Sequence, residues 1–165
     1  MEIRKAKADE IDSLMEMIDH SRELMRQSGN TIQWTNGYPQ RELILNDIKD
    51  NQQFVIEENG ELVGTFCLII GEDPNYKIIE NGTWLNDEKY GVIHRLATNG
   101  KAKGLAKFCF EWSFQQIPNI RIDTHETNIA MQKVLEKLGY KKCGIIYVSD
   151  GTPRLAFHKI DDKDE

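Results

Sequence analysis

The sequence predicts a mixed α/β protein in which helices cover both faces of one sheet. The first observation is the order of expected elements, which runs strand, two helices, hairpin, strand, helix, strand, helix and hairpin. The second is Asn59-Gly60 between two strand-like runs, because a type I′ turn needs positive φ at both central residues. The third is the apolar stripes at helical spacing. Together they predict an antiparallel front half and a strand–helix–strand–helix back half.

Local patterns give each element its limits. Asp9 can cap the first helix, whose apolar stripe begins at Ile11 and which should end near Ser28-Gly29-Asn30. Gly139 is placed to end the last helix in a left-handed conformation. The segment 76–90 is expected to hold at most a short helix or strand. The expected strands are 2–6, 53–57, 62–70, 92–98, 119–124, 143–148 and 154–158, and the later helices are 40–50, 101–116 and 127–138.

Length and composition indicate one folded core. At 165 residues with 39% hydrophobic residues, the chain is expected to form a single domain over residues 1–160, followed by a charged tail at 161–165. Three cysteines without C-x-x-C spacing predict neither a disulfide framework nor a structural zinc, so we expect a reduced, cytoplasmic protein without a metal. The apolar run 62–70 is too short to span a bilayer, so no membrane association is expected.

The charge balance is acidic. Lys and Arg number 21 against 27 Asp and Glu, which gives a net charge of −6. Such a chain is poorly suited to neutralise many phosphates, so we expect no nucleic-acid partner. The same balance slightly favours a cationic or amine-bearing acceptor.

The turn Asn99-Gly100-Lys101-Ala102-Lys103-Gly104 is the first candidate site. It joins the strand ending at Thr98 to a helix expected to begin near Lys101. The first turn of a helix offers unpaired N–H groups and partial positive charge, glycine allows close approach, and two lysines add charge, so the turn favours a phosphate group. It is not a Walker A loop, and it lacks the G-x-G-x-x-G of dinucleotide-binding folds.

At this turn the chain resembles the GNAT superfamily of acetyl-coenzyme A-dependent N-acetyltransferases. The coenzyme loop of that family reads Gln/Arg-x-x-Gly-x-Gly/Ala, and residues 101–106 match it with Lys in the first position. A second family signature, an Asn after a strand and a helix that closes with Gly-Phe/Tyr, is met by Asn128 and Gly139-Tyr140. With the hairpin, the resemblance covers nearly the whole chain. It implies a mostly antiparallel sheet of six to seven strands, about four helices, and a splay between the fourth and fifth strands.

The resemblance implies that acetyl-coenzyme A lies between the strands 92–98 and 119–124. Free backbone groups of the first strand would pair with the pantetheine arm, Asn128 would hold the arm from the other side, and N–H groups of the loop would bind the pyrophosphate. The loop after Thr98 is shorter than is usual in the family, so altered phosphate geometry is expected there. The coenzyme-binding residues implied are Leu96, Ala97, Thr98, Lys101, Ala102, Lys103, Gly104, Leu105, Ala106, Asn128 and Met131.

Acetyl transfer by direct attack in a ternary complex needs a deprotonated amine and an acid for the leaving thiolate. The family often places a Tyr seven residues after the Asn as this acid, but this chain has Leu135 there, so Tyr147 or a water is expected to replace it. His94 and His125 are the candidate bases, because histidine titrates in the right range, and Glu126 and Asp123 are alternative bases through a water chain. Strand alternation should place Asp123 and His125 on one face, where the carboxylate would orient the imidazole or raise its pKa. His20 and His158 are expected to be structural.

The acceptor is expected to be a primary amine of a small molecule or peptide. Trp34 and Tyr38 lie in an expected loop, 33–39, and are the candidate substrate contacts, with simple loop packing as the equal alternative. Two other functions stay open: a noncatalytic coenzyme A-binding regulatory module, which Leu135 favours, and a nucleotide or phosphate-ester enzyme, which would need a metal-binding side chain near Gly104. A homodimer is one of the open oligomeric states.

Overall fold

The protein contains a mixed seven-stranded sheet, as shown by a computed structural model that describes residues 1–29 and 33–161. The strand order is β1-β2-β3-β4-β5-β7-β6. The pair β4–β5 is parallel, whereas β1–β2, β2–β3, β5–β7 and β6–β7 are antiparallel. The prediction of a mixed, mostly antiparallel sheet is confirmed; the expected splay between β4 and β5 stays a prediction.

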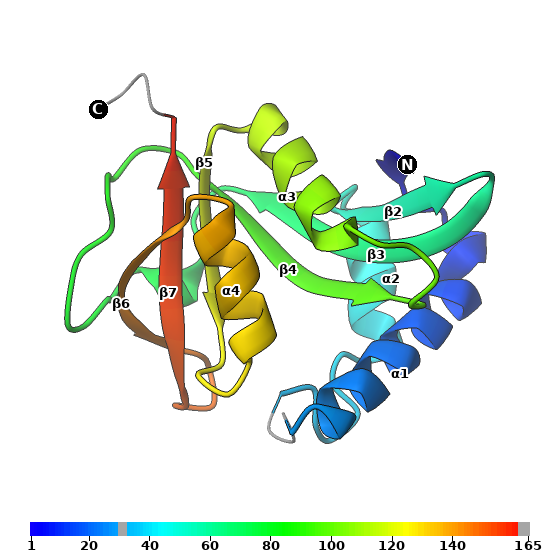
Figure 1. Ribbon diagram of the computed structural model, residues 1–165, viewed down its shortest axis with the longest axis horizontal. Helices are drawn as coiled ribbons and strands as arrows, with labels where there is room; N and C mark the ends of the chain where they lie inside the picture. Colours follow the sequence, from blue (N-terminus) through cyan, green and yellow to red (C-terminus); the bar gives the residue numbers. More distant parts are fainter. Residues whose placement is uncertain (30–32, 162–165) are drawn as a thin grey trace. The chain divides into compact units, whose positions relative to one another are not determined.

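The elements follow the expected order along the chain (Figure 1). The strands are β1 (Glu2–Lys5), β2 (Gln53–Glu58), β3 (Glu61–Ile70), β4 (Gly91–Thr98), β5 (Asn119–Thr124), β6 (Lys141–Tyr147) and β7 (Pro153–Ile160). The α-helices are α1 (Ile11–Gln27), α2 (Arg41–Lys49), α3 (Leu105–Gln116) and α4 (Ile129–Lys137), and short 3-10 helices cover Ala8–Glu10 and Pro74–Tyr76.

The chain divides into two compact units. The first comprises residues 1–68 and 94–112, and the second comprises 69–93 and the chain from Ser113 onward. Strand β4 and helix α3 therefore each contribute residues to both units. Of the expected tail 161–165, only Asp161 belongs to the described residues, and Asn30, named as part of the first helix stop, lies outside them.

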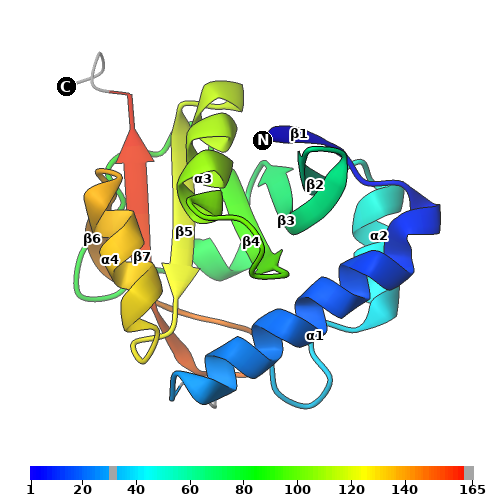
Figure 2. The ribbon, with the colours of Figure 1, turned by 45° about the vertical axis from the view of Figure 1, so that its right-hand side comes forward.

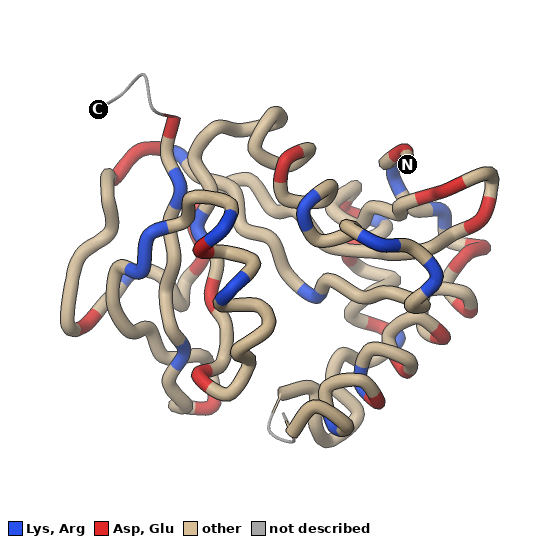
Figure 3. Tube along the Cα trace, viewed as in Figure 1, with Lys and Arg blue, Asp and Glu red and all other residues tan. Residues whose placement is uncertain are grey.

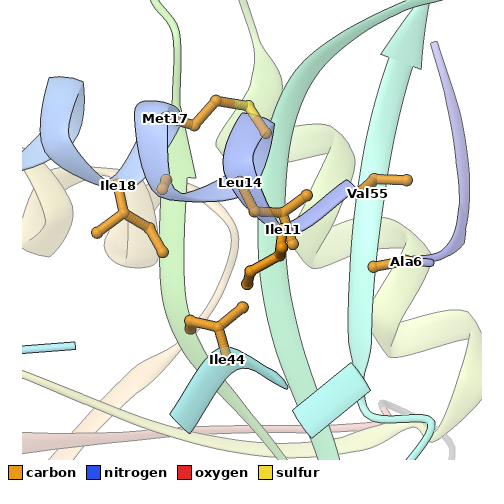
Figure 4. Close-up of a cluster of buried hydrophobic side chains, with 8 residues drawn as sticks. Ala6, Ile11, Leu14, Met17, Ile18, Ile44 and Val55 are labelled. Carbon is orange, nitrogen blue, oxygen red and sulfur yellow. The ribbon is translucent and has the colours of Figure 1, made fainter. Parts of the chain in front are cut away.

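In the first unit, the two faces of the β2–β3 hairpin have different partners. Val55 belongs to an apolar cluster with α1 and α2, in which Leu14, Ile18 and Ile44 have no exposed surface (Figure 4). Phe54, the neighbour of Val55 on β2, points to the opposite face and packs on Trp112 of α3 with ring centroids 5.1 Å apart. Burying each aliphatic side chain of this kind contributes about 1.5–3 kcal/mol.

In the second unit, different elements cover the two faces of strands β5, β7 and β6. Helix α4 lies against these strands (Figure 2), and its Leu135 is fully buried. A separate apolar cluster joins Tyr76 and Tyr90 of the β3–β4 connection to strand residues of the sheet; its other buried members are Val92, Ile146 and Ala156. The connection 71–90 therefore acts as one wall of this core, although its only regular elements among the described residues are the 3-10 turn and a single bridge between Glu80 and Ile145.

Several expected details of the chain are confirmed. Asn59 and Gly60 have φ of 52° and 80°, as a type I′ turn requires. Gly139, with φ of 88°, follows the last helix in the left-handed region. Strand β5 occupies the predicted residues, 119–124.

Two helix starts were predicted wrongly. Asp9 does not cap α1, because it lies inside a preceding 3-10 helix whose start is stabilised by Glu10, which accepts a hydrogen bond from the Lys7 N–H at 2.8 Å. Helix α3 begins at Leu105 rather than Lys101. The reason is Gly104, whose φ of 72° is incompatible with a right-handed helix. Over the described residues, we find no helix both long and apolar enough to cross a bilayer.

Candidate coenzyme and acceptor site

The candidate phosphate-binding loop covers residues 99–104, because α3 starts four residues later than predicted. The expectation of a short loop before the helix is therefore wrong. Asn99 anchors the loop to β3: its backbone N–H donates to the Val63 carbonyl at 3.2 Å and its side-chain amide donates to the Leu62 carbonyl at 2.9 Å. Its side-chain oxygen accepts from the Lys101 N–H at 3.0 Å, which fixes the turn that follows.

Gly104 shapes the end of this loop. Its carbonyl accepts the N–H of Phe108 at 3.0 Å, so the N–H groups of Leu105, Ala106 and the next residue have no partner within the helix turn. A Cβ placed on Gly104 would meet nothing within 4 Å, so the space beside these groups is open within the described residues. This is the arrangement in which a helix start receives an anion.

The positive charge expected at the loop is present. Lys101 and Lys103 are exposed, and Figure 3 shows basic positions along the segment that leads into α3. Lys101 lies 4.0 Å from Glu61, a contact between two exposed side chains that contributes little. Ala102 and Ala106 are half-buried, and Leu105 is buried against Gly64 of β3. The loop therefore combines small residues, N–H groups without a partner in the helix turn, and exposed cations.

The end of β4 differs from the expectation. The N–H of Thr98 donates to the Ser21 hydroxyl at 2.8 Å, and that hydroxyl donates to the Thr98 carbonyl at 3.2 Å. The prediction of free backbone groups around Leu96 to Thr98 is therefore wrong for Thr98, because a serine of α1 already uses both. Leu96 is half-buried, and the Ala97 side chain is buried in the apolar cluster of the first unit.

Arg95 marks an irregularity in the middle of β4. Its φ of 54° is rare for a residue with a side chain and costs of order 1–3 kcal/mol. The side chain forms an ion pair with Asp47 of α2, in which each side chain is only 9% exposed. Burial lowers the Arg95 pKa, but Cys67, Tyr38 and Asp47 outweigh it and the pKa is raised. The residue with this unusual backbone conformation is thus tied to α2 through its side chain.

The candidate acceptor residues Trp34 and Tyr38 both lie in the first unit. The Tyr38 hydroxyl accepts a hydrogen bond from Arg95 at 3.3 Å, while its ring remains exposed. Trp34 packs against the apolar cluster and also lines a hollow of about 310 Å³. The remaining lining residues are Arg22, Arg26, Gln33, Thr35, Asn36 and Gly37. The structure thus joins Tyr38 to β4 through Arg95 and assigns Trp34 a packing role as well.

The two candidate bases occupy different surroundings. His94 is half-buried on β4, directly before Arg95. His125 follows the last residue of β5 and is buried; its Nδ1 lies 2.8 Å from the Thr127 hydroxyl and accepts the Thr127 N–H at 3.1 Å. Because Nδ1 accepts this bond, Nε2 carries the proton of the neutral ring. Burial, followed by the charge of Arg154, lowers the pKa of His125.

The expected pairing of Asp123 with His125 is wrong. Alternation requires a continuous strand, but β5 ends at Thr124 and the chain turns at His125, whose carbonyl accepts the Asn128 N–H at 3.0 Å. Asp123 instead accepts a hydrogen bond from the Tyr76 hydroxyl at 2.6 Å. The pKa of His125 is accordingly lowered rather than raised.

Asn128 and Met131 form the start of α4. The Asn128 side-chain oxygen accepts from the Met131 N–H at 3.2 Å, which is the bond of a helix N-cap. This capping role accounts for an asparagine at this position independently of a coenzyme. Leu135 is fully buried in the second unit, so its position supplies core packing and no acid.

Tyr147 lies at the end of β6 with 43% of its surface exposed. A hydrogen bond to Glu80 and the charge of that carboxylate raise the pKa of Tyr147. The hydroxyl therefore stays protonated at neutral pH, as an acid for a thiolate must. His158, expected to be structural, is fully buried: its Nδ1 accepts from the Leu85 N–H at 3.1 Å and its Nε2 donates to Asn119.

Sequence reasoning missed Ser21, Asp47, Arg95 and Tyr76. Each of these residues contacts a residue far away in the sequence, and such long-range contacts leave no local sequence pattern. A usable signal was Arg95 itself, since an arginine in a half-buried strand needs a partner. The thiols of Cys67, Cys109 and Cys143 are buried and not joined in disulfides, and within 1–29 and 33–161 no three side chains gather as a metal site.

Comparisons with known proteins agree with this geometry. A family model described as an acetyltransferase (GNAT) domain matches residues 1–141. The chain belongs to the GNAT acetyltransferase family. A GNAT-family acetyltransferase from Streptococcus agalactiae shares 36% identity over 98% of this chain and 95% of that chain, with a TM-score of 0.89.

More distant structures share the fold of this GNAT protein. A GNAT-family acetyltransferase from Listeria monocytogenes is 17% identical over 96% of this chain and 93% of that chain, with a TM-score of 0.72. The enzyme AAC(6')-Ib, solved with ribostamycin and coenzyme A, is 18% identical over 96% of this chain and 92% of that chain, with a TM-score of 0.65. A search of curated proteins found no match. The resemblance seen in residues 101–106 and at Asn128 is thus confirmed at the level of family and enzyme class.

Proposed function

We propose that this GNAT acetyltransferase transfers an acetyl group from acetyl-coenzyme A to a primary amine of a small molecule or peptide, by direct attack in a ternary complex. The observation that carries the proposal is the loop 99–104, with its open glycine, two exposed lysines and unpaired helix N–H groups. These features fit a diphosphate. The coenzyme supplies the activated acetyl thioester. The structure of AAC(6')-Ib contains coenzyme A, which supports the same ligand here.

The coenzyme contacts that the family resemblance implies are proposed element by element. The N–H groups at the start of α3, with Lys101 and Lys103, would bind the diphosphate. In β4, Leu96 and Ala97 remain the proposed main-chain contacts, because the backbone N–H and carbonyl of Thr98 are already hydrogen-bonded to the Ser21 hydroxyl. Asn128 and Met131, at the start of α4, stay the proposed contacts of the pantetheine arm.

The proposed catalytic groups are His94 or His125 as base and Tyr147 as acid. The lowered pKa keeps His125 neutral at neutral pH, and its imidazole could accept a proton at Nδ1 once that nitrogen releases the Thr127 N–H. Tyr147 remains protonated for the reason given above.

Replacing His94 or His125 with Ala should lower turnover more than coenzyme affinity. If both variants keep the parent pH–rate profile, neither histidine is the base.

Calorimetry with acetyl-coenzyme A tests the loop assignment. Gly104→Trp should abolish binding, because the indole would fill the space beside the helix N–H groups. Gly151→Trp is the matched control: Gly151 also has positive φ, 83° against 72°, and a Cβ there also meets nothing within 4 Å. Loss of binding in the first variant alone supports the proposal, and equal affinity in both variants contradicts it.

An acetylation screen tests the reaction and its alternative. Polyamines, amino acids, aminoglycosides and peptides would be offered with acetyl-coenzyme A, and at least one amine should be acetylated. Binding of the coenzyme without turnover of any amine would favour the noncatalytic module that Leu135 suggests. A rise in melting temperature with ATP but not with acetyl-coenzyme A would favour a nucleotide enzyme.

A further inference from the structure

The carboxylate of Asp123 on β5 has one well-defined contact. Its Oδ2 accepts the hydroxyl of Tyr76 at 2.6 Å, a distance typical of a charge-assisted O–H···O⁻ bond. Burial, then the charge and hydrogen bond of Asp123, raise the pKa of Tyr76 well above its ordinary value. The phenol therefore keeps its proton and donates it to this oxygen.

Tyr76 is held rigidly. Only 1% of its surface is exposed, and its ring lies 5.2 Å from Trp84 and 6.2 Å from Tyr90 between centroids. Its carbonyl accepts the Trp84 indole N–H at 2.9 Å, which ties both residues to the same turn. A hydroxyl fixed in this way orients the carboxylate that it touches.

The carboxylate keeps unused capacity. An ionised carboxylate offers about four acceptor positions, and Tyr76 fills one. Asp123 is half-buried, and none of the described cations lies within ion-pair distance of it. Arg121, two residues earlier on β5, is occupied by the rings of Trp84 and Tyr90. The cross-strand neighbour Ala156 carries only a methyl group, so it offers Asp123 no partner.

We propose that Asp123 binds the ammonium group of the acceptor, with Tyr76 as its positioning residue. This inference rests on the proposed function and gives it a substrate class: alkyl amines that are cationic at neutral pH. A partly desolvated, oriented carboxylate favours a compact cation that donates several hydrogen bonds, and an ammonium group is such a cation. The ring of His125, two residues later in the chain, is a separate group whose Nδ1 could take the proton once it releases the Thr127 N–H.

The binding step can be tested without turnover. The ¹⁵N-labelled full chain would be titrated with 1,6-hexanediamine and, as a neutral probe of equal length, 1,6-hexanediol. The diamine should shift the amide resonances of Asp123 and Thr124, and the diol should not. Asp123→Asn should weaken diamine binding about 10- to 100-fold, as expected for loss of a charged hydrogen bond. Asp123→Glu should recover part of the affinity.

Tyr76→Phe tests whether Tyr76 orients the Asp123 carboxylate or only contributes to the stability of the fold. It removes only the hydroxyl, so the fold should persist, and diamine affinity should fall about 3- to 10-fold. With an acceptor found in the screen, Asp123→Asn should raise the KM for the amine more than it lowers kcat. Glu136→Gln, which removes an exposed carboxylate of α4, is the matched control and should change neither measurement.

The outcomes separate this inference from the proposed function. Diamine binding that survives Asp123→Asn, or equal shifts with the diol, would overturn the assignment. Diamine binding that depends on Asp123 in a protein that acetylates no amine would support the amine site and contradict the acetyltransfer reaction. Acetylation of an amine whose KM is unchanged in Asp123→Asn would contradict the amine site and leave the reaction intact.

Discussion

Each unit of the molecule contains an arginine with little exposed surface, and the two arginines are stabilised differently. In the first unit, Arg95 faces the carboxylate of Asp47, and each side chain is 9% exposed. In the second, Arg121 is 4% exposed and lies between Trp84 and Tyr90, with its carbon Cζ 4.4 and 4.0 Å from the ring centroids. Its Nη2 donates to the Asn86 carbonyl at 2.6 Å.

The pKa values reflect the difference. Burial lowers both, but the surrounding groups of Arg95 reverse the effect and raise its pKa, whereas that of Arg121 stays lowered. Around Arg95 the charges of Cys67, Tyr38 and Asp47 outweigh the effect of burial on the pKa, whereas around Arg121 burial outweighs the charges of Tyr90 and Asp87. The first unit therefore depends on the matched pair of Arg95 and Asp47, and the second on a cation held by aromatic rings and a backbone carbonyl.

Removing the carboxylate of the matched pair should have the largest effect. Asp47→Ala leaves the Arg95 guanidinium buried without its counter-ion, and the expected loss is about 3–5 kcal/mol in the free energy of unfolding, measured with urea. The double variant Asp47→Leu/Arg95→Met removes both charges and should lose less than Asp47→Ala. A loss below about 1 kcal/mol for Asp47→Ala would show that water reaches the pair.

The buried His158 of the second unit should make the protein sensitive to acid. Burial, then the charge of Arg121, lowers the pKa of His158 from 6.5 to about 4. Between these pH values the unfolded chain binds a proton that the folded chain does not, so stability is lost as the pH falls through this range. The loss is about 3 kcal/mol. Urea unfolding at pH 7 and pH 4 should show a smaller difference for His158→Gln than for the parent, whereas His20→Gln, at an exposed histidine, should keep the parental difference.

Replacing the cation Arg121 should lower the free energy of unfolding less than replacing the anion Asp47 does. Arg121→Met keeps the buried stem and leaves no unpaired charge, so the expected loss is about 2 kcal/mol from the two ring contacts and the hydrogen bond. The same variant should reduce the acid sensitivity, because the charge that helps hold down the pKa of His158 is gone. An unfolding free energy reduced as much as in Asp47→Ala would refute the distinction between the two regions.

The smallest effect is expected at the exposed edge of the matched pair. Tyr38→Phe removes a 3.3 Å hydrogen bond to Arg95 at a ring that is 38% exposed. The expected loss is at most about 0.5 kcal/mol, since water replaces the hydroxyl. A loss above 1 kcal/mol in urea unfolding would mean that Tyr38 shares the buried environment of Asp47.

Regular local patterns were sufficient for much of the fold. Alternation and flanking turns fixed β5 at its observed residues, and Asn59-Gly60 fixed the hairpin, because each depends on backbone preferences of neighbouring residues. The start of α3 was misplaced because Lys101, Ala102 and Lys103 suit a helix. Gly104 could have indicated the later start of α3, since glycine is accepted at a helix N-cap.

The sequence by itself determined the mixed α/β class, the hairpin, the glycine and lysines of the coenzyme loop and the asparagine before α4, since these are short-range features. Only the tertiary structure decided that Ser21 hydrogen-bonds the backbone of Thr98, that Arg95 forms an ion pair with Asp47, and that Asp123 accepts a hydrogen bond from Tyr76 rather than pairing with His125. Those partners are separated by 77, 48 and 47 positions in the chain. The physical reason is that buried polar groups take whichever partner the packed elements bring within reach, and that choice is made in three dimensions.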